Sequence, residues 1–294
     1  MGILFLSFGW AHVQAQRQIE VRNANSLEFN DRYSGAQRLI GDVIFEHEGT
    51  LLYCDSAYLY DLTNRLEAYS NIRIVSDSAT ITGDRLFYDG KTRIADISGK
   101  EVKLTDPGTR LLTDRLLYDT GKNTASYSNG ARIESSKNRN ELVSKKGQYL
   151  AKEKAFYFQG KVRITSPEYT LYSDSLKYST GTETAWFYGP TQLLSKPDSI
   201  YCERGFYNLK SGHSKFEQNA SVHSGVRSVH AEEIQYNQKT GEGLALRKVR
   251  IVDSTEHVVV AGNRVRYNEL SGSMVVSDSA LLEQKFSGDT LSLH

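Results

Sequence analysis

Five acidic residues recur along the chain in a pattern that could build a ladder of metal ligands. They are Asp84, Asp114, Asp174, Glu203 and Glu232. Carboxylates stacked on one face would suit a hard cation such as Ca²⁺. However, the Gly-rich nonapeptide that marks calcium-binding β-rolls is absent, and the same column holds Ser56 and Lys145. The sequence therefore predicts polar groups at strand ends that meet water or cap turns.

The other side chains that could do chemistry are scattered. The seven histidines form no HxH or HExxH pair, which are spacings that bind zinc. The chain contains no GxSxG motif, no Gly-rich phosphate loop and no paired Cys/His nucleophile. The best basic cluster, Lys137–Asn140 with Lys145 and Lys146, fits a solvated turn better than the groove of a polysaccharide lyase. We therefore expect no enzyme, no cofactor and no metal site.

The composition favours strands. The 294 residues include 18 Tyr and 11 Phe but four Pro, and no long stretch has helical periodicity, so we expect a mostly β protein. The 36 Lys and Arg balance the 35 Asp and Glu, giving a net charge of +1. That balance argues against a nucleic-acid binder, which usually carries a basic excess.

The first 16 residues differ from the rest. A short apolar run, Ile3–Trp10, precedes the small-residue site Val13–Ala15, as in a secretory signal peptide. No Lys or Arg precedes the run, and the alternative is a buried first strand. The run is too short to span a bilayer. We expect residues 1–16 to be a signal peptide and the chain to be exported.

One phrase recurs throughout the remainder. Residues 113–121 read TDRLLYDTG and residues 83–91 read GDRLFYDGK. Aligned on the last aromatic residue, nine copies follow each other at intervals of 28 to 31 residues. The aligned residues are Phe29, Tyr60, Tyr88, Tyr118, Tyr149, Tyr178, Tyr207, Tyr236 and Tyr267. Such a period is typical of a repeat protein in which each unit packs on its neighbours.

Each unit alternates apolar and polar residues between Gly- and Asn-rich turns, which predicts three short strands per unit. Leu116 and Tyr118 then point to one face, and Arg115 and Leu117 to the other. Gly147 and Gly205 stand where other units have a large apolar residue. Either they leave room in a channel or they pack beside a bulky partner.

The two cysteines, Cys54 and Cys202, hold the same type of position five units apart. Stacked strands separate them by roughly 24 Å or more, whereas a disulfide needs Cα atoms within about 7 Å. We expect two unpaired, buried thiols.

Three segments carry a pattern of the form G-x-x-L-x-Y-D…A-x-x-x-G-x-V-x-I: Gly83–Leu104, Thr113–Ile133 and Ser173–Leu194. Over residues 17–294 the chain resembles the OstA-like family, to which the periplasmic lipopolysaccharide-transport bridge LptA belongs. The resemblance implies an open, twisted, antiparallel β-jellyroll. It also implies that lipopolysaccharide passes along an apolar groove towards the outer membrane, through subunits stacked head to tail.

The same resemblance implies a periplasmic protein with two continuous jellyrolls, residues 17–165 and 166–294. The implied partners are lipopolysaccharide or a related lipid and, by strand addition at the ends, other transport components or further copies of the chain. Ser287–His294 reads as the start of a tenth unit, either a capping strand or the beginning of a further region. The residues implied to line the groove are Leu86, Tyr88, Val102, Leu104, Leu116, Tyr118, Ile133, Val162, Ile164, Leu176, Tyr178, Ile234 and Tyr236.

Two other hypotheses remain open at this point. An apolar stack could close on itself as a dry core and serve as a structural scaffold or adhesin stalk. Lipid bound after purification would distinguish the conduit from the scaffold. A carbohydrate-active β-helix enzyme would require an acidic groove, which the sequence does not reveal.

Overall fold

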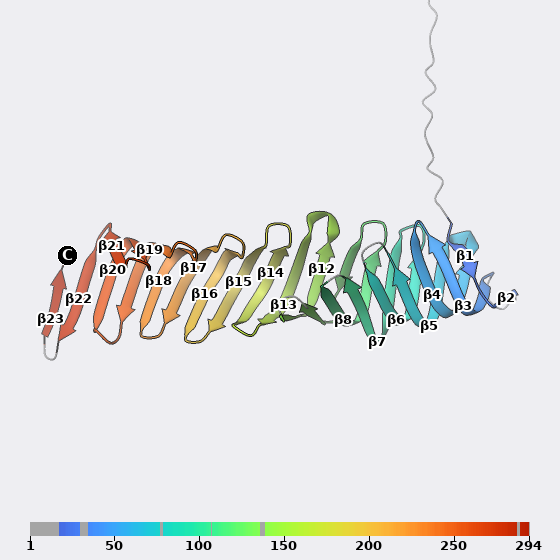
Figure 1. The fold of residues 1–294 in the computed structure, drawn as a ribbon, viewed down its shortest axis with the longest axis horizontal. Coiled ribbons are helices and arrows are strands. Elements are labelled where there is room, and N and C mark those ends of the chain that lie inside the picture. The colour runs from blue at the N-terminus through green and yellow to red at the C-terminus, as the bar shows by residue number, and fades with distance from the viewer. Residues whose placement is uncertain are drawn as a thin grey trace, which may run out of the picture.

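The computed structural model describes residues 18–29, 35–76, 79–106, 108–135, 139–286 and 289–293. The predicted signal peptide lies outside these residues. Within them the chain forms one antiparallel sheet of 23 strands and two single-turn 3₁₀ segments, η2 (Asp61–Thr63) and η3 (Ala151–Glu153). The strands follow one another along a single long axis (Figure 1). The prediction of an all-β, open jellyroll is confirmed.

The strands are β1 (Glu20–Asn23), β2 (Ser26–Phe29), β3 (Gln37–His47), β4 (Thr50–Tyr60), β5 (Arg65–Val75), β6 (Thr80–Asp89), β7 (Ile94–Asp106), β8 (Thr109–Asp119), β9 (Thr124–Tyr127), β10 (Ala131–Ser135), β11 (Glu141–Ser144), β12 (Lys146–Leu150), β13 (Ala155–Thr165), β14 (Thr170–Ser179), β15 (Thr184–Ser195), β16 (Asp198–Asn208), β17 (His213–Ser224), β18 (Arg227–Asn237), β19 (Glu242–Asp253), β20 (Val258–Asn268), β21 (Ser273–Ser277), β22 (Leu281–Phe286) and β23 (Asp289–Leu293).

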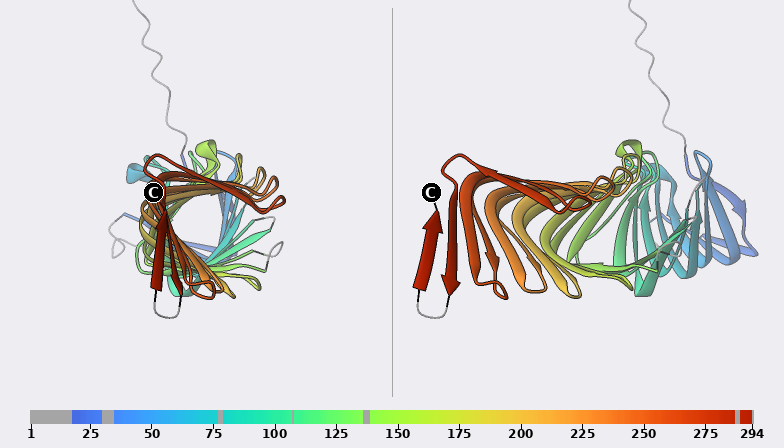
Figure 2. Two further views of the ribbon diagram at one scale, coloured as in Figure 1. Left: turned by 90° about the vertical axis from the view of Figure 1, so that its left-hand side faces the viewer. Right: turned by 60° about the vertical axis from the view of Figure 1, so that its left-hand side comes forward.

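Each repeat contributes two long strands, and the expectation of three short strands is wrong. Strands β6 and β7 form one such pair, antiparallel along nearly their full length. The sheet also bends around its long axis, so that strands surround the axis when it is viewed end on (Figure 2). The sequence suggested a strand break where the structure has a bend, because a bend and a turn both interrupt the apolar alternation.

The bend lies at a β-bulge in the middle of every second strand. In β5 the register shifts beside Ser70 and Asn71, both of which have a left-handed backbone with φ of 62° and 53°. Bulges with left-handed residues recur at Gly41 and Asp42, Gly160 and Lys161, Gln218 and Asn219, and Arg247 and Lys248. A bulge increases the local twist and turns the strand, so a bulge repeated in register folds the whole sheet along one line.

The polar column predicted at strand ends lies over these bulges instead. The Nδ2 of Asn219 donates to Glu203 at 2.8 Å, and the Nζ of Lys248 donates to Glu232 at 2.7 Å. At the bulge of β7, the backbone N–H of Lys100 donates to Asp84 at 2.8 Å. A bulge leaves unpaired backbone groups, and Asp84 supplies a partner to one of them, while Glu203 and Glu232 bond to the side chains of bulge residues. The spacing of these polar residues along the sequence therefore follows the spacing of the bulges.

The bulges divide the sheet into two arms that face each other. The tyrosine arm ends at hairpins such as residues 89–94, and the aliphatic arm ends at hairpins such as residues 165–170. We call the concave side the inner face; its side chains form one continuous buried cluster. Leu116 and Tyr118 lie on this face at 0% and 3% exposure, whereas Leu117 is 42% exposed. The predicted orientation of the recurring phrase is therefore correct.

Large and small residues alternate across the strands of the tyrosine arm. Ala95 pairs with both Tyr88 and Tyr118, and Ala185 pairs with both Tyr178 and Tyr207. A small residue between two rings lets their side chains pack without a clash. In the second unit the equivalent of Tyr88 is Leu59, since both pair with Leu66. The prediction that Tyr60 is the aligned residue of the second unit is therefore wrong by one position, and the correct residue is Leu59.

Away from its two ends, the sheet departs from paired long strands between β8 and β13. Two pairs of short strands replace the long ones there, β9 with β12 and β10 with β11. Strand pairing nevertheless continues along the aliphatic arm, through β10 and β11, and along the tyrosine arm, through β9 and β12. The proposed division after residue 165 falls in the hairpin between β13 and β14, whose strands pair with each other.

The two glycines that replace apolar residues are sites of close packing. A Cβ at Gly147 would lie 2.4 Å from the Tyr127 hydroxyl, and one at Gly205 would lie 2.4 Å from the Lys215 carbonyl oxygen. Neither glycine therefore leaves room for a ligand on the inner face. The two cysteines are buried, free thiols, and burial raises the pKa of each to about 12.

Gly205→Ala is expected to destabilise the fold because the new methyl group would meet backbone, which cannot move aside as a side chain can. Overpacking of this kind costs about 1–3 kcal/mol. Gly181→Ala is the matched control, since its nearest neighbour would lie 3.8 Å away, and we expect a change within about 0.5 kcal/mol. Denaturant unfolding of both variants measures the difference. Equal stability of the two would show that the strands at Gly205 are not in close contact.

Candidate functional site on the inner face of the sheet

All thirteen residues predicted to line a groove lie on the inner face. Seven are at most 3% exposed: Leu86, Tyr88, Val102, Leu116, Tyr118, Val162 and Leu176. Ile133 and Ile234 are 8% and 7% exposed. Leu104, Ile164, Tyr178 and Tyr236 are partly exposed. The structure therefore brings the predicted residues onto one surface, and most of them are covered by the opposite arm.

A continuous apolar row runs along the aliphatic arm from one end of the sheet to the other. In order of pairing it comprises Phe45, Leu52, Ile74, Ile81, Leu104, Leu111, Ile133, Leu142, Ile164, Leu171, Leu193, Ile200, Val222, Val229, Ile251, Val260 and Leu282. Every member is aliphatic or Phe, so no polar side chain interrupts the row.

The solvent exposure of the side chains in this row changes along the molecule. Phe45, Leu52, Ile74 and Ile81 are at most 1% exposed. From Leu193 to Ile251 the equivalent residues are partly exposed and pack at the margin of the buried cluster. The row is thus closed over β3 to β6 and partly open over β15 to β19.

Polar contacts join the tips of the two arms in the N-terminal half. The Tyr88 hydroxyl lies 2.6 Å from Nδ1 of His47, and Arg93 forms an ion pair with Glu48 at 2.6 Å. The Tyr118 hydroxyl similarly lies 3.0 Å from the Ser76 hydroxyl. Burial raises the pKa of Tyr88 to about 12, so this phenol stays neutral in any physiological buffer. These contacts, which we call the clasp, hold the arms together.

Equivalent tyrosines in the C-terminal half bond within their own arm. The Tyr207 hydroxyl donates to Gln238 at 2.7 Å, and the Tyr236 hydroxyl donates to Glu269. The bond to the Glu269 carboxylate is the largest cause that raises the pKa of Tyr236 to about 12. Because these hydroxyls bond along the tyrosine arm, they do not tie it to the aliphatic arm.

Five partly exposed residues of the apolar row were missed by sequence reasoning. They are Leu193, Ile200, Val222, Val229 and Ile251. The signal that points to them is the alternating pair that closes each unit, such as Val102 and Leu104. In two units the first member of that pair is Thr191 or Ala220, which weakens the apolar pattern.

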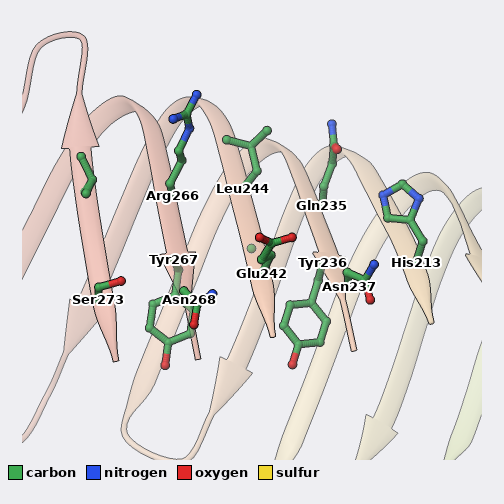
Figure 3. Close-up of a pocket in the computed structure, with 12 residues that line it drawn as sticks. His213, Gln235, Tyr236, Asn237, Glu242, Leu244, Arg266, Tyr267, Asn268 and Ser273 are labelled. Atoms are coloured by element: carbon green, nitrogen blue, oxygen red, sulfur yellow. The ribbon is translucent and has the colours of Figure 1, made fainter. Parts of the chain in front are cut away.

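The predicted residue Tyr236 also borders a hollow of about 530 Å³ over β17 to β21. Figure 3 shows Arg266, Leu244, Gln235 and His213 pointing to one side of the sheet, and Tyr236 and Tyr267 pointing to the other. Gly243 pairs with both tyrosines and has no side chain, so a gap remains between their two rings. The hollow is shaped by this gap and belongs to neither face alone.

Nothing in the described residues provides a centre for metal chemistry. No group of three or more His, Cys, Asp or Glu side chains among them could hold a metal ion. The described part of the chain also contains no helix long and apolar enough to cross a membrane.

Comparisons with known proteins identify the family. Residues 16–174 match the model of the family described as OstA-like protein. Residues 141–273 match a second model, described as LptA/(LptD N-terminal domain) LPS transport protein. The first match covers more than half of the 294 residues. The chain therefore belongs to the OstA-like family of β-jellyroll proteins.

Among solved structures, the chain is similar to LptH from Pseudomonas aeruginosa, the LptA-homologous periplasmic component of its lipopolysaccharide transport device. The two are 12% identical, and the match covers 58% of this chain and 82% of LptH, with a TM-score of 0.20. A TM-score this low does not establish a shared arrangement of the whole chains. No curated protein matches the sequence.

Tyr88→Phe is expected to lower the free energy of unfolding by about 1–2 kcal/mol, because it removes a buried hydrogen bond between the arms. Tyr207→Phe is the matched control on the same row. Its hydroxyl bonds to an exposed amide, so we expect a loss within about 0.5 kcal/mol. Equilibrium denaturation of the two variants makes the comparison. An equal loss in both would mean that the clasp contributes nothing beyond an ordinary surface contact.

Proposed function

We propose that the chain is a non-enzymatic periplasmic bridge that carries lipopolysaccharide along its inner face towards the outer membrane. The observation that carries this proposal is the partial exposure of the apolar row between Leu193 and Ile251. The match to the lipopolysaccharide-transport model, residues 141–273, falls on the same half of the chain. The open part of the inner face and the transport-family match therefore support each other.

An unbroken aliphatic row suits an acyl chain that has to move. Each CH₂ buried on such a surface contributes about 0.8 kcal/mol, and neighbouring members of the row, such as Ile200, Val222 and Val229, are nearly equivalent. A lipid that shifts by one strand exchanges one aliphatic contact for another. The lipid is therefore held along the row without a deep minimum at any position. No bond is made or broken, so this function needs no catalytic group.

The ends of the sheet support the proposed assembly with other transport components or with further copies of the chain. At one end β2 pairs with β3, and at the other β23 pairs with β22. The second edge of each terminal strand can accept a further strand, since unpaired N–H and C=O groups on a sheet edge are a template for strand addition. Addition at both ends would extend the apolar row from one subunit to the next.

The alternative function, a structural stack with a dry core, is favoured by one part of the molecule. In the N-terminal half the inner face is filled and the clasp closes it. Leu116, for example, is 0% exposed. For the conduit to include this half, the arms must separate at the clasp. If the protein is a scaffold, the closed half needs no opening to function.

Photo-crosslinking in cells that make labelled lipopolysaccharide tests the proposal. We expect a probe at Ile200 or Val229 on the inner face to capture the lipid, and a probe at Tyr201 not to do so. Tyr201 is the matched control, since it neighbours Ile200 and points outward. A third probe at Leu116 reports whether the closed half admits lipid.

The outcomes separate the two functions. Capture from Ile200 and Val229 with no capture from Tyr201 supports the conduit. Absence of capture from all inner positions would favour the scaffold. Equal capture from Ile200 and Tyr201 would indicate that lipid merely coats the surface.

A further inference from the structure

Two rows of side chains on the outer face form a patch that the lipid conduit does not use. The first row comprises Gln148, Tyr157, Lys177, Trp186 and Phe206, and the second comprises Lys146, Gln159, Ser175, Tyr188 and Arg204. Both cross the same five strands, β12 to β16. All ten side chains are partly or fully exposed. We call this surface the outer aromatic patch.

The patch surrounds a hollow of about 540 Å³. Gly147, Phe158 and Leu176 lie between the two rows, and the side chains of Phe158 and Leu176 join the inner core. The floor of the hollow is therefore backbone. Its rim presents the rings of Tyr157 and Tyr188 together with amide and hydroxyl groups.

Two aromatic side chains of the patch, those of Tyr157 and Trp186, flank one cation. The Lys177 ammonium lies 5.0 Å from the ring centre of Tyr157 and 5.4 Å from that of Trp186. Cation–π contacts at this range hold a lysine in place. Tyr188, on the neighbouring row, is 44% exposed and offers a flat apolar ring to the solvent. The patch thus combines a positioned positive charge with an exposed stacking surface.

The charge around the patch is positive although the whole chain is nearly neutral. Residues 145–163 contain six Lys or Arg and one Glu. The two rows themselves include Lys146, Lys177 and Arg204 and no carboxylate. Three carboxylates border the patch: Glu153 accepts a hydrogen bond from Tyr157 at 2.7 Å, Asp174 accepts one from Ser175 at 3.3 Å, and Glu217 pairs with Arg204 on the next strand.

We propose that the outer aromatic patch binds an acidic saccharide. The C–H face of a sugar ring stacks on an exposed aromatic ring such as Tyr188, since the ring is apolar on its face. Gln148, Gln159 and Ser175 can bond to sugar hydroxyls. Lys177, Lys146 and Arg204 pair with the acidic groups through charge-assisted hydrogen bonds. The site lies on the face opposite the lipid row, so it does not depend on the proposed transport function.

Trp186 provides a reporter inside the patch. The chain has two tryptophans, Trp10 and Trp186, and a Trp10→Phe chain makes the fluorescence specific to the patch. The probe is tetragalacturonate, an acidic oligosaccharide with no acyl chain, and the neutral comparison is maltotetraose. We expect a saturable fluorescence change with tetragalacturonate and an affinity at least tenfold weaker for maltotetraose. Calorimetric titration measures the same affinities independently.

Matched variants assign the binding to the patch. Tyr188→Ala and Lys177→Met are each expected to weaken tetragalacturonate binding at least tenfold. Tyr172→Ala is the control, since Tyr172 is 45% exposed and lies on the outer face of the other arm; we expect no change. Absence of saturable binding to the unaltered patch would overturn the proposal without any variant. Equal binding of both sugars, or equal loss in Tyr172→Ala and Tyr188→Ala, would also overturn it.

Discussion

The bulge in every second strand is the constraint on which the shape of the molecule depends. An antiparallel sheet of this length would otherwise twist gradually and expose one apolar face along its whole extent. Left-handed residues such as Ser70 and Asn71 turn each strand at the same height, and the two arms then cover each other. Non-glycine residues adopt this conformation at a cost of about 1–2 kcal/mol each. The polar column recovers part of that cost by bonding to the bulge, as Asn263 does by accepting from the backbone N–H of the left-handed Lys248.

Once the arms face each other, the contacts at their tips decide whether the inner face is closed. The same column of tyrosines performs both roles. Tyr88 reaches across to His47, whereas Tyr207 bonds to Gln238 on its own arm. The difference lies in what each hairpin offers, a buried histidine in one case and an amide beside the tyrosine in the other. A repeat protein can thus vary the openness of its interior by changing hairpin residues, while the bulges and the apolar rows stay unchanged.

The sequence predicts the repeat and the orientation of its side chains because both follow from periodicity. Leu116 and Tyr118 face inward for that reason, and the thirteen predicted residues all lie on the inner face. The number of strands per unit was not predictable in the same way. A bulge made of Gln218 and Asn219 carries no glycine signal, so it looks like a break between strands. The exposure of Ile200 and Val229 could not be predicted either, since it depends on which hydroxyl bonds across the arms and not on the residues themselves.

Alternation along a strand also lets the two faces be specified independently. In β15, Phe187 lies in the core while Trp186 and Tyr188 face outward. A substitution that alters the outer aromatic patch therefore leaves the inner apolar row in place, and the reverse also holds. Gly147 is an exception, because the Tyr127 ring fills the space beside it on the inner side while its backbone forms part of the floor of the outer hollow. At that position one residue therefore borders both faces of the sheet. A side chain at Gly147 would displace Tyr127 inside and change the floor of the patch outside, so the two surfaces are coupled there.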